Sequence, residues 1–149
     1  MRSQTEFHSL IQSQIDAGIP SNRIVLGGFS QGGAMALLSG LSAPHKLGGI
    51  FGLSCYLLLQ NKVKDLVPAE NPNKDTKIFM GHGDADNVVQ HEWGKLSAEK
   101  LKELGWNVDF KTYRRLGHSA SEDEIDDLEK YLTEVIPPLG DAQKAEESL

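Results

Sequence analysis

The spacing of apolar positions divides the chain into helical and extended segments. Apolar side chains recur every three or four residues in four stretches, which is typical of helices that bury one face. The predicted helices cover residues 2–17, 31–41, a segment that ends at Gly105, and 121–135. The last helix opens with a capping-box pattern, because Ser121 is followed three positions later by Glu124.

Shorter apolar runs between the helices predict strands, over residues 23–27, 49–53, 77–81 and 108–113. The first three runs are typical of strands buried on both faces. The fourth alternates apolar and polar residues and is expected nearer an edge. Because strands alternate with helices, the sequence predicts an α/β fold with a parallel sheet and helices on both of its faces.

The order of these elements indicates that the sheet has further strands. A helix comes first, and the strand with the most buried character, residues 23–27, follows it. At the edge of a four-stranded sheet an apolar strand would promote aggregation, so we expect additional strands upstream of Met1. Residues 1–138 would then form the C-terminal part of a larger α/β domain, and the polar residues 139–149 a flexible tail.

Composition narrows the class of protein. The 149 residues include 39% hydrophobic and 24% charged residues, as in a folded domain. The net charge of −6 argues against a nucleic-acid-binding surface. The longest apolar run, residues 55–59, is far shorter than the ~20 residues that span a bilayer, so no stable membrane insertion is expected. The single cysteine, Cys55, excludes an intramolecular disulfide and fits a reducing, intracellular compartment.

A G-x-S-x-G pattern over residues 28–32 predicts a nucleophile elbow, because it lies between a predicted strand and a predicted helix. The sharp turn is expected to strain the backbone of Ser30. Glycine at positions 28 and 32 (Gly28 and Gly32) would avoid a collision with the neighbouring backbone. The turn would expose the Ser30 hydroxyl above the sheet and direct the backbone N–H of Gln31 at a developing oxyanion.

A serine nucleophile needs a base and an orienting carboxylate, which follow it in the chain order Ser, Asp or Glu, His. Asp84 and Asp86 both come after the third predicted strand, and spacing alone does not separate them. His118 comes after the fourth strand. The carboxyl ends of parallel strands meet at one edge of a sheet, so we expect these residues to lie near Ser30. His82, directly after the third strand, would either brace the Asp loop or catalyse.

The remaining histidines are expected away from the site: His8 on the surface of the first helix, His45 in a loop and His91 near a helix start. No H-x-x-x-H pair or cysteine cluster supports a metal site. The sequence therefore predicts a site without a metal.

Several segments resemble the acyl-protein thioesterases, which belong to the phospholipase/carboxylesterase group of α/β-hydrolases. The most specific is Gly-Ile-Pro-Ser-Asn-Arg-Ile (residues 18–24), which runs on into Gly-Gly-Phe-Ser-Gln-Gly-Gly-Ala (residues 27–34). Residues 47–55, 81–86, 110–113 and 117–119 also match in the expected order. The resemblance covers nearly everything from residue 2 to residue 138.

The resemblance implies a triad of Ser30 as nucleophile, Asp86 as orienting acid and His118 as base. It selects Asp86 over Asp84, because the second acid of the family's His-Gly-Asp-x-Asp motif is the triad member. The resemblance implies an enzyme that removes palmitoyl and other long-chain acyl groups from S-acylated proteins, notably G-protein α subunits. It also implies that the enzyme acts in the cytoplasm and in the nucleus. Weaker lysophospholipase and small-ester activity, and no cofactor, are also implied.

The family also has an apolar acyl channel, partly lined by the loop after the second predicted strand. Tyr56, Leu57 and Leu58 are the candidate acyl-binding residues here, although the leucines would serve equally well as core residues under a long loop.

Two features depart from the family's pattern. Asn87 stands where the family usually has proline, and no His-Gly-x-Gly loop, which would supply a second oxyanion N–H, occurs in the chain. Losing one such donor typically lowers the rate by ~10²–10³-fold. Two alternatives to a thioesterase remain. One is a lysophospholipase or carboxylesterase, and the other is a catalytically silent fragment that binds acyl chains or a partner protein.

Overall fold

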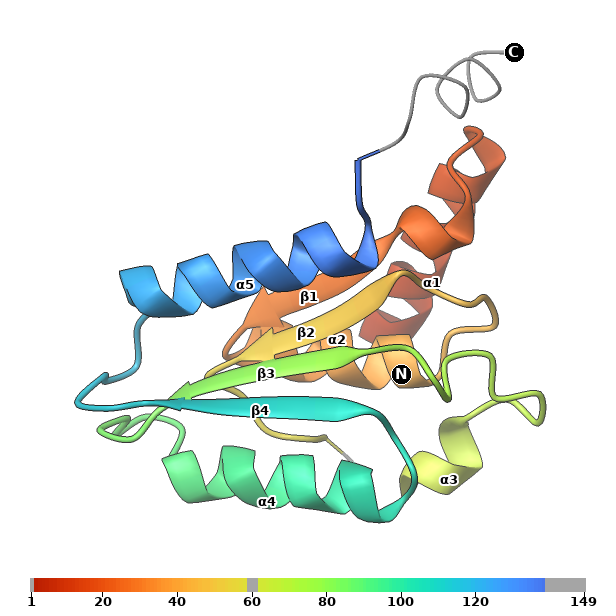
Figure 1. Ribbon diagram of the computed structural model, residues 1–149. Helices are drawn as coiled ribbons and strands as arrows, with labels where there is room; N and C mark the ends of the chain where they lie inside the picture. The colour runs from red at the N-terminus through yellow and green to blue at the C-terminus, as the bar shows by residue number, and fades with distance from the viewer. Residues whose placement is uncertain (1, 59–61, 139–149) are drawn as a thin grey trace.

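The structure is a computed structural model, and it describes residues 2–58 and 62–138. The chain forms a parallel sheet between two layers of helices (Figure 1). The predicted tail, residues 139–149, lies outside the described residues, as does Leu59 of the apolar run after the second strand.

Helices and strands alternate along the chain as the apolar spacing predicts. The elements are α1 (Arg2–Asp16), a short 3-10 helix (Ser21–Arg23), β1 (Val25–Phe29), α2 (Gln31–Leu41), β2 (Gly49–Leu53), α3 (Val63–Leu66), β3 (Ile78–Gly83), α4 (His91–Glu103), β4 (Val108–Tyr113) and α5 (Glu122–Val135). The four strands are parallel, in the order β1-β2-β3-β4. This confirms the predicted fold class, and β1 and β4 form the two edges of the described sheet.

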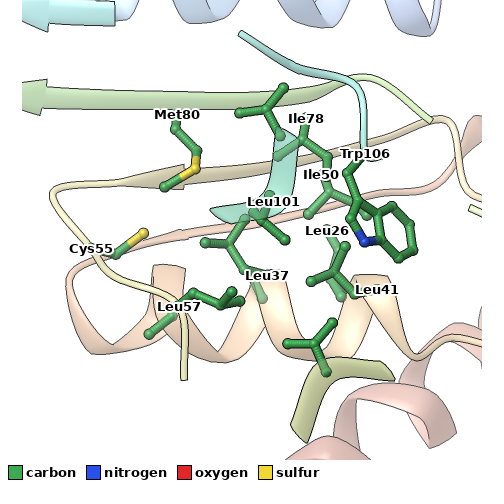
Figure 2. Packing of buried hydrophobic residues seen from close by; sticks show 14 of the residues in the cluster. Leu26, Leu37, Leu41, Ile50, Cys55, Leu57, Ile78, Met80, Leu101 and Trp106 are labelled. Atoms are coloured by element: carbon green, nitrogen blue, oxygen red, sulfur yellow. The ribbon is translucent and has the colours of Figure 1, made fainter. Parts of the chain in front are cut away.

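The helices cover both faces of the sheet. The helices α2 and α4 pack on one face, with α1 against α2, whereas α5 packs on the other (Figure 1). The larger core cluster lies on the α2 side, where Leu37 and Leu41 of α2 meet Leu26 and Ile50 of the sheet (Figure 2). Tyr131 of α5 belongs to the smaller cluster. Each face therefore has its own apolar core.

The structure differs from the sequence prediction at the first strand, at the third strand and at the short helix α3. The first strand begins at Val25 and runs through Phe29, because its ladder with β2 continues to the pair Phe29↔Leu53. The third strand continues to Gly83, which pairs with Tyr113, so the prediction that this strand ends at residue 81 is wrong. The four-residue helix α3 is too short to show periodicity and was not predicted.

The start of α5 forms only half of the expected capping box. The Ser121 hydroxyl accepts a hydrogen bond from the Glu124 N–H at 3.1 Å. The Glu124 side chain does not reach back to the cap. It is fully buried against the sheet, where a Cβ added to Gly81 would lie 2.6 Å from its Oε2 atom. The sequence pattern therefore located the helix start but not the direction of the glutamate.

Candidate active site

Ser30 occupies the turn between β1 and α2 with a strained backbone. Its φ of 57° and ψ of −123° lie where residues other than glycine are rarely found. The expectation of strain is confirmed, at a typical cost of ~1–3 kcal/mol. Two backbone hydrogen bonds hold the turn, since the Ser30 N–H donates to the Leu53 carbonyl at 2.8 Å and the Ser30 carbonyl accepts from the Ala34 N–H at 3.0 Å.

Only one of the two predicted elbow glycines is sterically required. A Cβ at Gly28 would lie 2.6–2.8 Å from backbone atoms of Gly32 and Gly33, which cannot move aside without opening the turn. A Cβ at Gly32 would meet no atom within 4 Å, so the predicted collision there is wrong. In the first turn of α2 it is Gly33 that faces the strand, where its Cβ would lie 2.8 Å from the Gly28 carbonyl oxygen. Close strand–helix packing therefore depends on Gly28 and Gly33.

His118 bridges Ser30 and Asp86, and each of these three residues comes from a different loop. Its Nδ1 atom lies 2.8 Å from Oδ2 of Asp86, and its Nε2 atom lies 2.9 Å from Oγ of Ser30. An ionised carboxylate can only accept, so Nδ1 must carry the proton and Nε2 is left to accept from the serine hydroxyl. The Phe29 ring packs on the imidazole, with centroids 4.8 Å apart. The geometry thus fixes the tautomer that lets Nε2 act as a base.

Asp86 is buried, and its carboxylate is fully engaged. The backbone N–H groups of Val88 and Val89 both donate to its Oδ1 atom at 2.9 Å, while Oδ2 faces His118. Burial raises the pKa of Asp86, but the hydrogen bonds from His118 and from the Val89 and Val88 backbone outweigh it, so the pKa lies below its usual value. Asp86 is therefore a carboxylate at neutral pH.

Asp84, the other candidate acid, takes part in a different contact. It is exposed, and its Oδ1 atom accepts a hydrogen bond from the Arg115 N–H at 2.7 Å. Arg115 adopts a positive φ of 60° in the loop that leads to His118. The side chain of Asp84 therefore orders this loop, and it is Asp86 that contacts the histidine.

The other predicted residues fall into two groups. Gln31 is the first residue of α2, so its N–H has no acceptor within the helix.

The other four histidines make contacts of their own through the ring nitrogen Nε2. This atom lies near the Ser39 carbonyl oxygen in His8, Gln12 in His45, Thr112 in His91 and the Val89 carbonyl oxygen in His82. His8 is half-buried, so the expectation that it lies on the surface is wrong. Within residues 2–58 and 62–138, none of these four histidines is hydrogen-bonded to Ser30.

The candidate acyl-binding residues divide between surface and core. Tyr56 is half-buried and packs edge-on against Trp93, whereas Leu57 is 4% exposed and belongs to the main core. Leu58 also packs against that core. Tyr56 and Leu57 line a pocket of about 220 Å³ together with Trp93, Leu96 and Ser97. The contributions of α4 were not predicted, because Trp93 and Leu96 are ordinary helix residues in a single sequence.

More apolar surface adjoins the site. Phe29 beside the serine and Val88 beside the aspartate are 40% and 64% exposed. Within residues 2–58 and 62–138, no cluster of three or more His, Cys, Asp or Glu side chains is arranged to hold a metal. None of the helices in these ranges is both long and apolar enough to cross a bilayer.

The parallel sheet with a strained serine at a strand–helix turn is the architecture of an α/β-hydrolase. The chain belongs to the phospholipase/carboxylesterase family, whose model matches residues 1–136.

Acyl-protein thioesterase 1 of Neurospora crassa is 53% identical over 149 residues, which are 100% of this chain and 61% of that relative. Acyl-protein thioesterase 1 of Emericella nidulans is 55% identical over 138 residues, 92% of this chain and 58% of that protein. The chain thus spans about three-fifths of the length of these relatives.

Crystal structures show the same relationship. Arabidopsis thaliana SOBER1 has a TM-score of 0.83 at 33% identity, covering 89% of this chain and 62% of that one. Zea mays acyl-protein thioesterase 2 has a TM-score of 0.69 at 32% identity, covering 74% of this chain and 55% of that one.

Proposed function

We propose that the protein is a serine hydrolase that removes long-chain acyl groups from the cysteines of S-acylated proteins. The observation that carries the proposal is the hydrogen-bonded chain from Ser30 through His118 to the Asp86 carboxylate. A buried aspartate, a fixed imidazole tautomer and an elbow serine, which is half-buried here, are the three parts that nucleophilic catalysis by serine requires. The names of the thioesterase relatives support the choice of a thioester.

The first half of the reaction would form an acyl-enzyme. His118 Nε2 takes the proton of the Ser30 hydroxyl as Oγ attacks the thioester carbonyl carbon. The Asp86 carboxylate stabilises the imidazolium that results. The backbone N–H of Gln31, at the positive end of α2, donates to the oxyanion. The C–S bond then breaks and the cysteine leaves as a thiol, with the proton supplied by His118.

The second half would release the fatty acid. Water replaces the thiol, His118 Nε2 takes its proton, and the hydroxide attacks the Ser30 ester. When the ester bond breaks, His118 returns the proton to Oγ. The net reaction consumes one thioester and one water and yields a carboxylic acid and a thiol, and the steps balance with the groups of Ser30, His118 and Asp86 and with water.

Apolar surface near the elbow supports a long acyl substrate. Tyr56 follows β2 and Val88 follows β3, so both lie at the carboxyl-end edge of the sheet, as Ser30 does. The pocket formed by Tyr56, Leu57 and α4 residues would hold part of the chain, with the rest on exposed Val88 and Phe29. G-protein α subunits as substrates, and action in cytoplasm and nucleus, rest on the family resemblance alone.

Labelling with a fluorophosphonate probe, read by mass spectrometry, tests the proposal. Such probes phosphonylate activated serines, so we expect modification at Ser30 and none in the Ser30→Ala variant. Comparing hydrolysis of a palmitoyl thioester with that of a lysophospholipid then separates a thioesterase from a lysophospholipase. Folded chain that is not labelled would contradict the proposal for this chain and favour a catalytically silent acyl- or protein-binding role.

A further inference from the structure

His82 is a buried imidazole that the proposed mechanism does not use. It lies near the end of β3, four residues before Asp86, and is 1% exposed. Fully buried histidines need a reason, because the ring must satisfy two nitrogen atoms away from water. The contacts of its Nε2 atom indicate what that reason is.

The Nε2 atom of His82 faces the turn that carries Asp86. It lies 2.7 Å from the Val89 carbonyl oxygen, which can only accept, so Nε2 carries the proton and donates. The same nitrogen is 3.4 Å from Oδ2 of Asp86, the oxygen that contacts His118. The Val89 N–H donates in turn to Oδ1 of Asp86. Residue 89 is therefore bonded on one side by His82 and on the other by Asp86.

Close packing keeps the imidazole in this orientation. A Cβ added to Gly94 of α4 would lie 2.3 Å from Nδ1 of His82, so the glycine lets the helix approach the ring. The ring of His91 packs edge-on at 5.6 Å, and its own Nε2 lies 2.8 Å from the Thr112 hydroxyl. Gly94 and His91 both belong to α4, so this helix packs directly against the imidazole.

The charges around His82 favour its neutral form. The titratable groups that face it are Asp86, His91 and His118. Burial lowers the pKa of His82 most, and the two histidines lower it further, whereas the Val89 hydrogen bond and the Asp86 charge oppose this. The net pKa is below its usual value, so the ring is neutral near pH 7 and is a hydrogen-bond donor rather than a cation.

We propose that His82 is a positioning residue whose Nε2–H holds the 86–89 turn in the geometry that points Oδ2 of Asp86 at Nδ1 of His118. The inference deepens the proposed function and rests on it. No proton moves through His82. It acts on the reaction only by fixing the carboxylate that fixes the tautomer of His118.

Replacing His82 by glutamine or asparagine separates its hydrogen bond from its packing. The amide nitrogen of glutamine falls near the position of Nε2 and can still donate to the Val89 carbonyl, whereas that of asparagine falls near Nδ1 and cannot. We expect His82→Asn to lower kcat for an acyl thioester by about 10²-fold with little change in KM, because a misplaced reacting group costs on that order. His82→Gln should recover most of the loss.

NMR of ¹⁵N-labelled histidine reads the same effect without relying on catalysis. In the unmodified chain and in His82→Gln, we expect His118 to show a single Nδ1–H tautomer. In His82→Asn we expect a mixture of tautomers. This measurement remains informative even if the chain hydrolyses nothing, so failure of the proposed function would be distinguished from failure of the positioning role.

A matched control and a second variant complete the test. His45→Asn changes a half-buried histidine in the loop between α2 and β2, where its Nε2 lies 3.0 Å from Oε1 of Gln12, and should alter neither readout. His82→Leu also removes the donor, but it fills the same space with an apolar side chain. If His82→Asn does not fold, His82→Leu takes its place in the test, with the same expected loss of kcat and the same mixture of His118 tautomers. A folded His82→Asn or His82→Leu with unchanged kcat and an unchanged His118 tautomer would overturn the inference. Equal losses in His82→Gln and His82→Asn would also overturn it, since packing alone would then explain both.

Discussion

The carboxyl group of Glu124 lies against the backbone of Gly81, so close that a Cβ on residue 81 would sit 2.6 Å from Oε2. The side chain is fully buried, and neither oxygen has a hydrogen-bond partner in the described part of the chain. Burial, together with the charge of Asp127, raises its pKa from about 4.5 to about 7. A proton is therefore retained in the folded state at pH values where an exposed glutamate has lost it.

The first prediction is that Glu124→Gln removes a pH-dependent loss of stability. Because the folded pKa is raised, the folded state binds more protons than the unfolded state, and the free energy of unfolding falls as pH rises from about 4.5 to 7. At ~1.4 kcal/mol per pKa unit the total is on the order of 3 kcal/mol. Urea unfolding at pH 5 and pH 8 should therefore show that the stability of Glu124→Gln relative to the unmodified chain increases with pH.

Glu129→Gln is the control, because Glu129 is exposed on the same helix. Its effect on the free energy of unfolding should be nearly the same at both pH values. A stability difference between Glu124→Gln and the unmodified chain that does not change with pH would show that Glu124 is ionised in the folded state.

The second prediction concerns the elbow glycines. Gly28→Ala places a methyl group 2.6 Å from the backbone of Gly32, whereas Gly32→Ala places one in open space. We expect Gly28→Ala to abolish labelling of Ser30 and to destabilise the fold by a few kcal/mol, as overpacking against backbone does. Gly32→Ala should retain labelling. Fluorophosphonate labelling and thermal unfolding of the pair test this, and equal behaviour of the two variants would show that the elbow geometry is different.

The sequence predicted the fold and the meeting of the three site residues because both follow from strand order. The ends of parallel strands share one edge, so Ser30, Asp86 and His118 needed only to follow their strands. Packing between elements was beyond the sequence. Single-sequence spacing assigned the steric requirement to Gly32, whereas the orientation of α2 gives it to Gly33.

Side-chain direction was the other limit. A capping-box pattern specifies Ser121 and Glu124 only by their separation along the chain. Whether the Glu124 side chain bonds back to the helix start depends on the space beside β3, where Gly81 has no Cβ and lets the carboxyl group pack against the strand. The resemblance to a family chose Asp86 over Asp84. The structure gives the physical difference, since two backbone N–H groups direct Asp86 toward the histidine, while Asp84 bonds the Arg115 N–H.

The third prediction is that Asp86→Asn lowers kcat by about 10³–10⁴-fold in an otherwise folded protein. An amide at this position can donate to Nδ1 of His118, which would favour the tautomer that carries its proton on Nε2 and cannot accept from Ser30. Asp84→Asn is the matched control. Its amide oxygen can still accept from the Arg115 N–H, so activity should be within a few-fold of the unmodified chain. If Asp84→Asn lost as much activity as Asp86→Asn, the assignment of the orienting acid would be wrong.

The fourth prediction separates stability from activity at Tyr131. Its hydroxyl accepts from the Ile50 N–H at 2.8 Å and also lies within hydrogen-bond distance of the Ile50 and Lys77 carbonyl oxygens, which ties α5 to the sheet. The Ile50 N–H lies near the start of β2, whereas Ser30 lies at the edge of the sheet where the strands end. The Ile50 N–H keeps the Lys77 carbonyl as an acceptor at 3.3 Å, so it is not left without a partner. Tyr131→Phe should therefore lower the free energy of unfolding by about 0.5–1.5 kcal/mol, the usual net contribution of a hydrogen bond.

Labelling of Ser30 and kcat/KM should be unchanged in Tyr131→Phe, because the ring still fills its place beside Phe79, with centroids 5.6 Å apart. Tyr113→Phe provides the comparison. Its hydroxyl donates to Asp127 at 2.8 Å in a half-buried contact, so its removal should cost less than the loss at Tyr131. Urea unfolding and turnover should be measured for both variants. A Tyr131→Phe variant as stable as the unmodified chain would contradict this account. The hydroxyl would then add nothing to the docking of α5, and apolar contacts alone would hold the helix on the sheet.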